Sequence, residues 1–220
     1  TTTAPTVTLP YQNGFYIPIS TPFELKGSAT DPDGDKLSYC WEEMDAGPEV
    51  PLGQPEGNCA IFRTFLPDTV SNRYFPKLLN IITNLSTVSE QLPTYTRDLN
   101  FRLTARDNRP DGGGVGWANV NFKAWEGAGP FKVSYPSTPG VVWRVGEYQN
   151  VQWDVANTDQ SPVNCKKVNV RLSVDGGKTY PITLASDVEN DGSQYVLVPN
   201  KISVTDRIRV EAADNVFFDI

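Results

Sequence analysis

Residues 99–106, with the sequence LNFRLTAR, decide the fold class because every odd position is apolar and every even position is polar. Successive side chains of a β-strand point to opposite faces, so this pattern predicts a half-buried antiparallel strand. Residues 117–124 (WANVNFKA) follow a glycine-rich turn and alternate in the same way, with Ala118, Val120, Phe122 and Ala124 on one face. The two runs predict a β-hairpin.

Strand patterns continue on both sides of this hairpin. Residues 23–28 and 37–42 flank an acidic turn, and Trp41 is placed to fill the centre of a sandwich. Downstream, alternating runs separated by turn signals predict strands at residues 131–135, 151–155, 168–173, 180–185, 194–198 and 208–212, with a further one beginning at 217–220. We expect a second sandwich whose last strand is cut short at Ile220.

The length and composition agree with an all-β class. The chain has 220 residues, 18 prolines and 17 glycines, which suit short strands joined by turns and two domains of roughly 100 residues each. We predict two tandem Ig-like antiparallel β-sandwiches with separate cores, residues 1–126 and 127–220, joined at residues 127–130 (GAGP). The first domain carries a long insertion, about residues 43–97, in which residues 76–83 predict a short helix.

The charge of the chain limits its partners. A net charge of −7 disfavours binding to nucleic acid or to an anionic membrane, because both need a basic face. The chain has no apolar run long enough to span a bilayer, and residues 1–5 (TTTAP) resemble an extracellular linker. We expect a monomeric piece of a longer secreted or cell-surface protein, with the neighbouring domains of the parent chain as its first partners.

Two acidic turns provide the candidate metal site. Asp31, Asp33 and Asp35 alternate in the first turn, and Asp107 and Asp111 lie in the second. Crowded carboxylates repel one another unless a cation or backbone donors offset them, and calcium prefers oxygen ligands. In an Ig-like domain the two turns are the B to C and F to G connections, which lie at the same end. The five aspartates therefore predict a calcium site, with ordinary turn chemistry as the alternative.

The three cysteines leave the redox state open. Cys40 and Cys59 are spaced to close a loop of about twenty residues, which would leave Cys165 as a free thiol. The alternative is that all three are small buried hydrophobic residues.

Two further patterns have both a structural and a functional interpretation. Residues 173–180 (SVDGGKTY) resemble the Asp-box hairpin, in which an aspartate and a threonine brace a tight turn, and we predict a structural role. Trp117, Trp125, Trp143 and Tyr148 are candidates for a sugar-stacking platform. Packing at a domain joint or sheet edge is the alternative for these aromatic residues.

Two groups of segments carry a resemblance to a known family: residues 27–35 with 39–42, and residues 168–181 with 215–220. They resemble the tandem Ig-like region that follows the catalytic domain in large secreted bacterial zinc metalloproteases of the reprolysin-like type. The first half is also similar to cadherin-like and polycystic-kidney-disease-type (PKD-like) domains, and the second half to a fibronectin type III domain. The resemblance implies an accessory region of a metalloprotease.

The sequence argues against catalysis in this region itself. Zinc proteases of that type need a His-Glu-x-x-His helix, and serine or cysteine nucleophiles need a base, but the chain contains no histidine. Glu42, Glu43 and Asp45 offer carboxylates without a specific spacing. We expect a non-catalytic spacer that can also recognise extracellular protein or glycan. The alternative is a cell-surface adhesion or carbohydrate-binding module, which predicts exposed aromatic residues on one sheet face.

Overall fold

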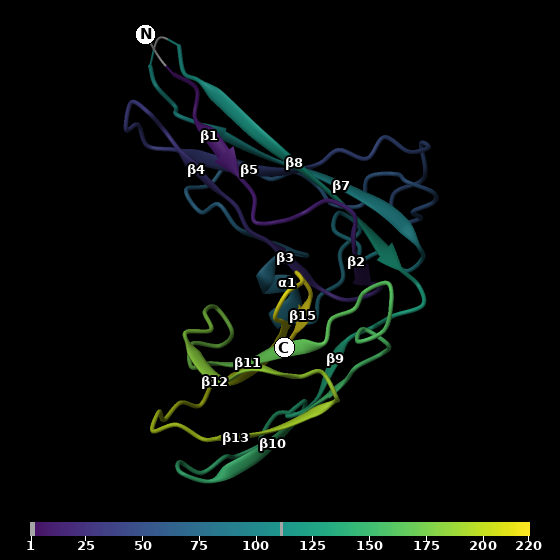
Figure 1. Cartoon of the computed structure of the whole chain (residues 1–220), viewed down its shortest axis with the longest axis vertical. Helices are drawn as coiled ribbons and strands as arrows, with labels where there is room; N and C mark the ends of the chain where they lie inside the picture. Colours follow the sequence, from purple (N-terminus) through teal and green to yellow (C-terminus); the bar gives the residue numbers. More distant parts are fainter. Residues whose placement is uncertain (1–2, 111) are drawn as a thin grey trace.

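The computed structural model describes residues 3–110 and 112–220, and the regular secondary structure of these residues is almost entirely β-strand (Figure 1). We call residues 3–126 the first unit and residues 127–220 the second unit. The first unit contains β1 (Thr6–Thr8), β2 (Phe15–Pro18), β3 (Phe23–Leu25), β4 (Ser28–Thr30), β5 (Ser38–Glu43), β6 (Arg73–Phe75), α1 (Leu78–Ile82), β7 (Arg97–Arg106) and β8 (Val115–Trp125). The second contains β9 (Lys132–Tyr135), β10 (Tyr148–Asp154), β11 (Lys167–Ser173), β12 (Ile182–Glu189), β13 (Ser193–Leu197), β14 (Arg207–Ala212) and β15 (Phe218–Asp219).

The hairpin predicted from the central alternation is confirmed. β7 and β8 pair antiparallel, from Arg97 opposite Ala124 to Arg106 opposite Val115. They form the middle of a four-stranded sheet of order β2-β8-β7-β5. One edge pairing differs from the rest, because β2 runs parallel to β8. Near the N-terminus, β1 pairs with β4. The chain then crosses to the edge of the four-stranded sheet, where β2 pairs with β8 and runs in the same direction.

The second unit consists of two facing sheets. Their orders are β13-β10-β9 and β12-β11-β14-β15. Apolar side chains from both sheets, including Val151, Trp153, Val170 and Val210, are buried in its interior. The strands lie close to the ranges that alternation predicts, because alternate side chains pack into the core. β14 departs from this pattern, since Arg209 is buried as well as Ile208 and Val210.

The long insertion packs against the first sheet. Trp41 donates a hydrogen bond from Nε1 to the carbonyl oxygen of Ser71 at 2.8 Å, and the rings of Phe62 and Phe75 lie 5.5 and 4.9 Å from that of Phe23. The predicted helix is present as α1. Within residues 3–110 and 112–220 no helix is long and apolar enough to cross a membrane.

The interiors of the two units are joined, which corrects the expectation of separate cores. Each sheet takes its strands from one unit, but the buried apolar side chains form one continuous cluster. The contact is made by the C-terminal segment, which lies between the units in Figure 1. Phe217 forms a β-bridge with Phe23, and the amide of Phe218 donates to the carbonyl of Pro22 at 3.0 Å. The division into domains at residue 126 stays a prediction.

Candidate functional site

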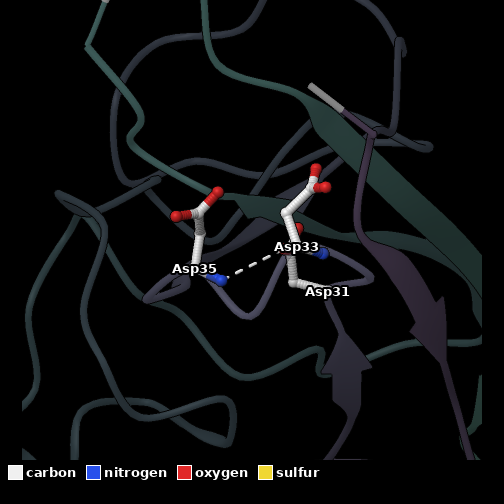
Figure 2. A group of neighbouring side chains, drawn as sticks. All are labelled: Asp31, Asp33 and Asp35. Atoms are coloured by element: carbon white, nitrogen blue, oxygen red, sulfur yellow. Dashed lines mark hydrogen bonds between the residues drawn. The ribbon is translucent and has the colours of Figure 1, made fainter. Parts of the chain in front are cut away.

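The first acidic turn, between β4 and β5, brings three carboxylates together. One oxygen each from Asp31, Asp33 and Asp35 lies within 4.8 Å of the others, and Figure 2 shows the Asp33 and Asp35 carboxylates extending in the same direction. Asp31 Oδ1 accepts hydrogen bonds from the backbone amides of Asp33 at 2.9 Å and Asp35 at 3.1 Å. These are the bonds of an ordinary Asx turn, so turn chemistry orders this loop.

The second turn places a positively charged side chain beside the carboxylates of the first turn. Arg109 lies in the turn between β7 and β8, and its Nη1 is 3.4 Å from Asp35 Oδ2 and 3.9 Å from Asp33 Oδ2. Ser38 Oγ also donates to Asn108 Oδ1 at 3.0 Å, so the two turns meet at the same end of the first unit. Sequence reasoning placed these turns together but missed Arg109, although it stands two residues after Asp107.

Asp107 orders its own turn. Its Oδ1 accepts the Arg109 amide at 3.1 Å, and its Oδ2 accepts the Gly114 amide at 2.7 Å. A Cβ at position 113 would stand 2.5 Å from Asp107 Oδ1, so the close approach requires the glycine that is present. Asp107 therefore lies outside the group formed by the other three aspartates. Asp111 lies outside the described residues.

The donor set of the first turn suits a hard cation. Calcium takes six to eight oxygen ligands from carboxylates, backbone carbonyls and water. Asp31 Oδ2 is buried and has no hydrogen-bond partner within the described residues, which leaves one carboxylate oxygen free for a further ligand. Arg109 already offsets part of the negative charge, and it would compete with a cation for Asp33 and Asp35.

A second charged site lies where the two units meet. Glu24 on β3 and Arg209 on β14 form an ion pair with Oε2 and Nη2 at 2.8 Å, and their side chains are only 5% and 6% exposed. The Arg209 guanidinium lies 4.0 Å from the centre of the Phe218 ring, and Asn72 Nδ2 donates to Glu24 Oε1 at 2.7 Å. Burial raises the pKa of Glu24, but Arg209 outweighs burial and holds this pKa below its ordinary value. No sequence pattern indicates this pair, because the partners are 185 residues apart.

A cleft of about 540 Å³ opens beside this pair, and its lining includes Tyr11, Lys26, Arg171 and Glu211. Two of its carboxylates are engaged with cations: Glu24 and Glu211 both contact Arg209, and Glu211 also contacts Arg171. Paired carboxylates of this kind stabilise the contact between the units, and they are poorly placed to exchange protons with a substrate.

A third charged cluster anchors the start of the insertion. Arg97 Nη2 lies 3.4 Å from Glu43 Oε1 and 3.4 Å from Asp45 Oδ2, and all three side chains are at most 1% exposed. Glu43 Oε2 accepts the backbone amides of Ile61 and Phe62 at 2.7 and 2.6 Å. Burial, together with the neighbouring Asp45, raises the pKa of Glu43 to about 8. The cluster is enclosed, and it ties the insertion to β7.

The hairpin after β11 has the bracing that its sequence predicts. Asp175 Oδ1 accepts the amides of Lys178 and Thr179, each at 3.0 Å, and Oδ2 accepts the Thr179 hydroxyl at 2.7 Å. These bonds hold the pKa of Asp175 well below its ordinary range. Gly176 and Gly177 have φ of 81° and 91°, which the turn requires. The predicted structural role is confirmed.

The three cysteines are buried free thiols, so the Cys40 to Cys59 disulfide is not formed in this structure. Cys40 Sγ donates to the Phe65 carbonyl and Cys165 Sγ to the Lys167 carbonyl, each at 3.3 Å. Burial raises the pKa of Cys40, and it raises that of Cys165 to about 12. Both groups are therefore neutral and poorly reactive at physiological pH.

The four aromatic candidates do not form one platform. Trp117 is 57% exposed on β8 of the first unit, whereas Tyr148 is 68% exposed on β10 of the second. Trp125 packs edge-on against Tyr16 at 6.3 Å, and Trp143 packs against the core. Sequence reasoning missed Tyr195 on β13, which alternation places on the solvent face of its strand.

No protein-family model matches this chain, and no curated protein matches it. Among solved structures it is similar to the FN1–FN3 domains of chicken CNTN1, at 12% sequence identity and a TM-score of 0.30. The match covers 97% of this chain and 65% of that structure, so this chain spans less than two thirds of its length. The protein is an all-β protein built from several packed, mainly antiparallel sheets.

Proposed function

We propose that this chain is a rigid, non-catalytic spacer that fixes the relative orientation of its two units in a longer secreted or cell-surface protein. The observation that carries this proposal is the ion pair of Glu24 and Arg209, which is removed from water and joins the units. A charge left buried without its partner costs about 3–5 kcal/mol, so arrangements that keep one partner buried and move the other away are disfavoured.

The connection between the units also supports rigidity. The Gly129 amide donates to the Ala156 carbonyl at 2.9 Å, and the Ile19 amide donates to the Ala128 carbonyl at 3.0 Å. A Cβ at position 129 would stand 2.3 Å from the Ile19 carbonyl oxygen, so the chain passes too close for any side chain. This segment is hydrogen-bonded on both sides, unlike a flexible glycine linker.

The test is the distribution of distances between the units. Spin labels on Asn119→Cys and Ser134→Cys, both exposed, report this distance by pulsed electron resonance, because the native thiols are buried. We expect one narrow distribution that broadens in Arg209→Met. Arg144→Met, which removes a solvent-exposed ion pair with Glu147, is the matched control and should leave it narrow. A broad distribution in the unsubstituted chain would overturn the proposal.

Calcium binding by the first acidic turn is a second element of the proposal, supported by the three convergent carboxylates and the unpartnered Asp31 Oδ2. A ligand at 100 times its dissociation constant that binds only the folded state adds about 2.7 kcal/mol. Melting with millimolar calcium against chelator should therefore show a shift that Asp33→Asn reduces. Asp98→Asn, an exposed aspartate on β7, is the control. The absence of any shift would reject the metal site and leave the spacer role intact.

We also propose that the parent is a secreted bacterial metalloprotease-like protein. The support is the resemblance of residues 27–35, 39–42, 168–181 and 215–220 to the accessory region of such proteases. Antibodies raised against this chain should isolate the parent from culture medium. Mass spectrometry of that protein should recover a peptide with a His-Glu-x-x-His sequence, and complete coverage without one would reject this parent.

A further inference from the structure

The outer face of the β13-β10-β9 sheet carries a group of exposed side chains that the spacer role does not use. Val151, Trp153 and Val196 point into the core, so the alternate residues of β10 and β13 point to solvent. We call this group the tyrosine face; it consists of Tyr148, Asn150, Gln152, Ser193, Tyr195 and Leu197. In Figure 1, β10 and β13 lie at the end of the molecule farthest from the N-terminus, so this face is remote from the joint.

The register of the two strands arranges these residues in three rows. Tyr148 lies opposite Leu197, Asn150 opposite Tyr195, and Gln152 opposite Ser193. The two tyrosines are therefore diagonal neighbours, about 7–8 Å apart at their Cα atoms. Tyr148 is 68% exposed and Tyr195 is 66% exposed, so their rings are open to solvent. A row of amide and hydroxyl groups continues from the rings along the strands.

The chemistry of the tyrosine face suits an uncharged polyhydroxylated ligand. Exposed tyrosine rings supply flat apolar surface with a polar edge, which fits the C–H face of a sugar ring. The side-chain amides of Asn150 and Gln152 can both donate to and accept from hydroxyl groups. Gln152 is exposed, whereas Asn150 is half-buried and its Oδ1 is covered by neighbouring atoms, so Gln152 offers the more accessible amide.

The charge and the area of the tyrosine face favour a neutral sugar over a charged ligand or a protein partner. None of the six side chains of the tyrosine face is charged. Beyond them on the same sheet face, Asp154 lies opposite Lys132, and these opposite charges offset each other. A polyanion or a basic peptide would therefore find little net counter-charge there. A stable protein dimer needs about 20–30 residues on each side, and this face offers far fewer. A chain of sugar rings needs only a few aromatic contacts in a line.

We propose that the tyrosine face is a binding surface for a neutral polysaccharide, with Tyr148 and Tyr195 stacking on neighbouring sugar units. This proposal goes beyond the spacer role and does not depend on the rigidity of the joint. Because the tyrosine face lies at one end of the molecule, binding there would hold the neighbouring domains of the parent chain near a glycan surface.

The test is retention of the full chain on insoluble neutral polysaccharides, namely cellulose, chitin and xylan. We expect the chain to bind at least one of them. Tyr148→Ala and Tyr195→Ala should each weaken binding roughly tenfold, which corresponds to about 1.4 kcal/mol. Trp117→Ala is the matched control, because it removes a similarly exposed aromatic side chain from the first unit and should bind like the unsubstituted chain.

Two measurements keep the result interpretable. Because Tyr148 and Tyr195 are exposed, melting temperatures of the variants should stay close to that of the unsubstituted chain, which separates loss of binding from loss of fold. Binding should also change little between about 0.05 and 0.5 M salt, because no charge pair is involved. The proposal is overturned by no retention on any of the three polysaccharides, by equal loss in Trp117→Ala, or by tyrosine variants that abolish only self-association in sedimentation.

Discussion

Arginine meets carboxylates both at the joint between the units and at the acidic turn, but the surroundings differ. At the joint, Arg209 and Glu24 are nearly fully buried, whereas Arg109 at the turn is 43% exposed beside Asp33 and Asp35. Water screens the exposed contact and leaves it weak, while the buried contact lacks that screening. Similar residue types therefore form a buried contact between the two units in one place and an exposed, water-screened contact in the other.

The largest effect should come from breaking the buried pair. Arg209→Met leaves the Glu24 carboxylate buried without its main partner, and we expect it to lower the free energy of unfolding by about 3–5 kcal/mol. Chemical denaturation measures this loss. The double substitution Glu24→Met with Arg209→Met should recover most of it, because the buried charge is gone. Equal stability of the single variant and the unsubstituted chain would show that the buried pair contributes no more than the exposed one.

A second test uses the buried cluster of Glu43, Asp45 and Arg97. Because burial raises the pKa of Glu43 to about 8, the folded state binds this proton more tightly than the unfolded state. Stability is therefore greatest below the ordinary pKa of a glutamate and falls as pH rises toward 8, by at most about 1.4 kcal/mol per pH unit. Glu43→Gln should remove this slope in denaturation series across that range. The exposed Glu49→Gln should retain it, and an unchanged slope in Glu43→Gln would refute the assignment.

A third test concerns an exposed carboxylate that is held by hydrogen bonds. The pKa of Asp175 is lowered, so its contribution to stability is present above the ordinary pKa of aspartate and is lost as pH falls through the lowered value. Asp175→Asn should lower the melting temperature at neutral pH, because it removes an acceptor from the hairpin. Asp206→Asn, another exposed aspartate, is the control. Identical melting of the two variants would show that the bracing contributes nothing.

The smallest effect should come from the acidic turn. Arg109→Gln removes an exposed cation, and we expect a change below about 1 kcal/mol that shrinks further in high salt. Calcium should raise the melting temperature of Arg109→Gln by more than it raises that of the unsubstituted chain, because a competitor for Asp33 and Asp35 is gone. Thermal melting in both conditions measures the difference. A loss of unfolding free energy as large as that expected for Arg209→Met would contradict the difference between the exposed and the buried contact.

Strand positions were predictable because burial has a local signature. The alternation of residues 99–106 and 117–124 predicted β7 and β8, and the bracing of the hairpin after β11 followed from one aspartate, two glycines and a threonine. The meeting of the two acidic turns also followed from the fold class. Features that depend on which strand lies beside which were not predictable: the parallel pairing of β2 with β8 was not foreseen, and the expectation of separate cores was wrong.

The candidate sites show the same division. The sequence supplied Asp31, Asp33 and Asp35 as neighbours, because the turn itself brings them together. Arg109 could have been added as their partner, because it lies in the second turn that the fold class already placed beside them. Tyr195 as the diagonal neighbour of Tyr148 could not, because that contact depends on strand register.

The sequence by itself determined that this protein is all-β, where most of its strands and tight turns lie, and which side chains face inward. Tertiary structure alone decided that Glu24 meets Arg209 across the joint and that the C-terminal segment lies between the units. The physical reason is that alternation shows on which face of a strand a residue lies, but not which segment packs against that face. The packing segment determines the local dielectric and therefore the strength of each charge pair.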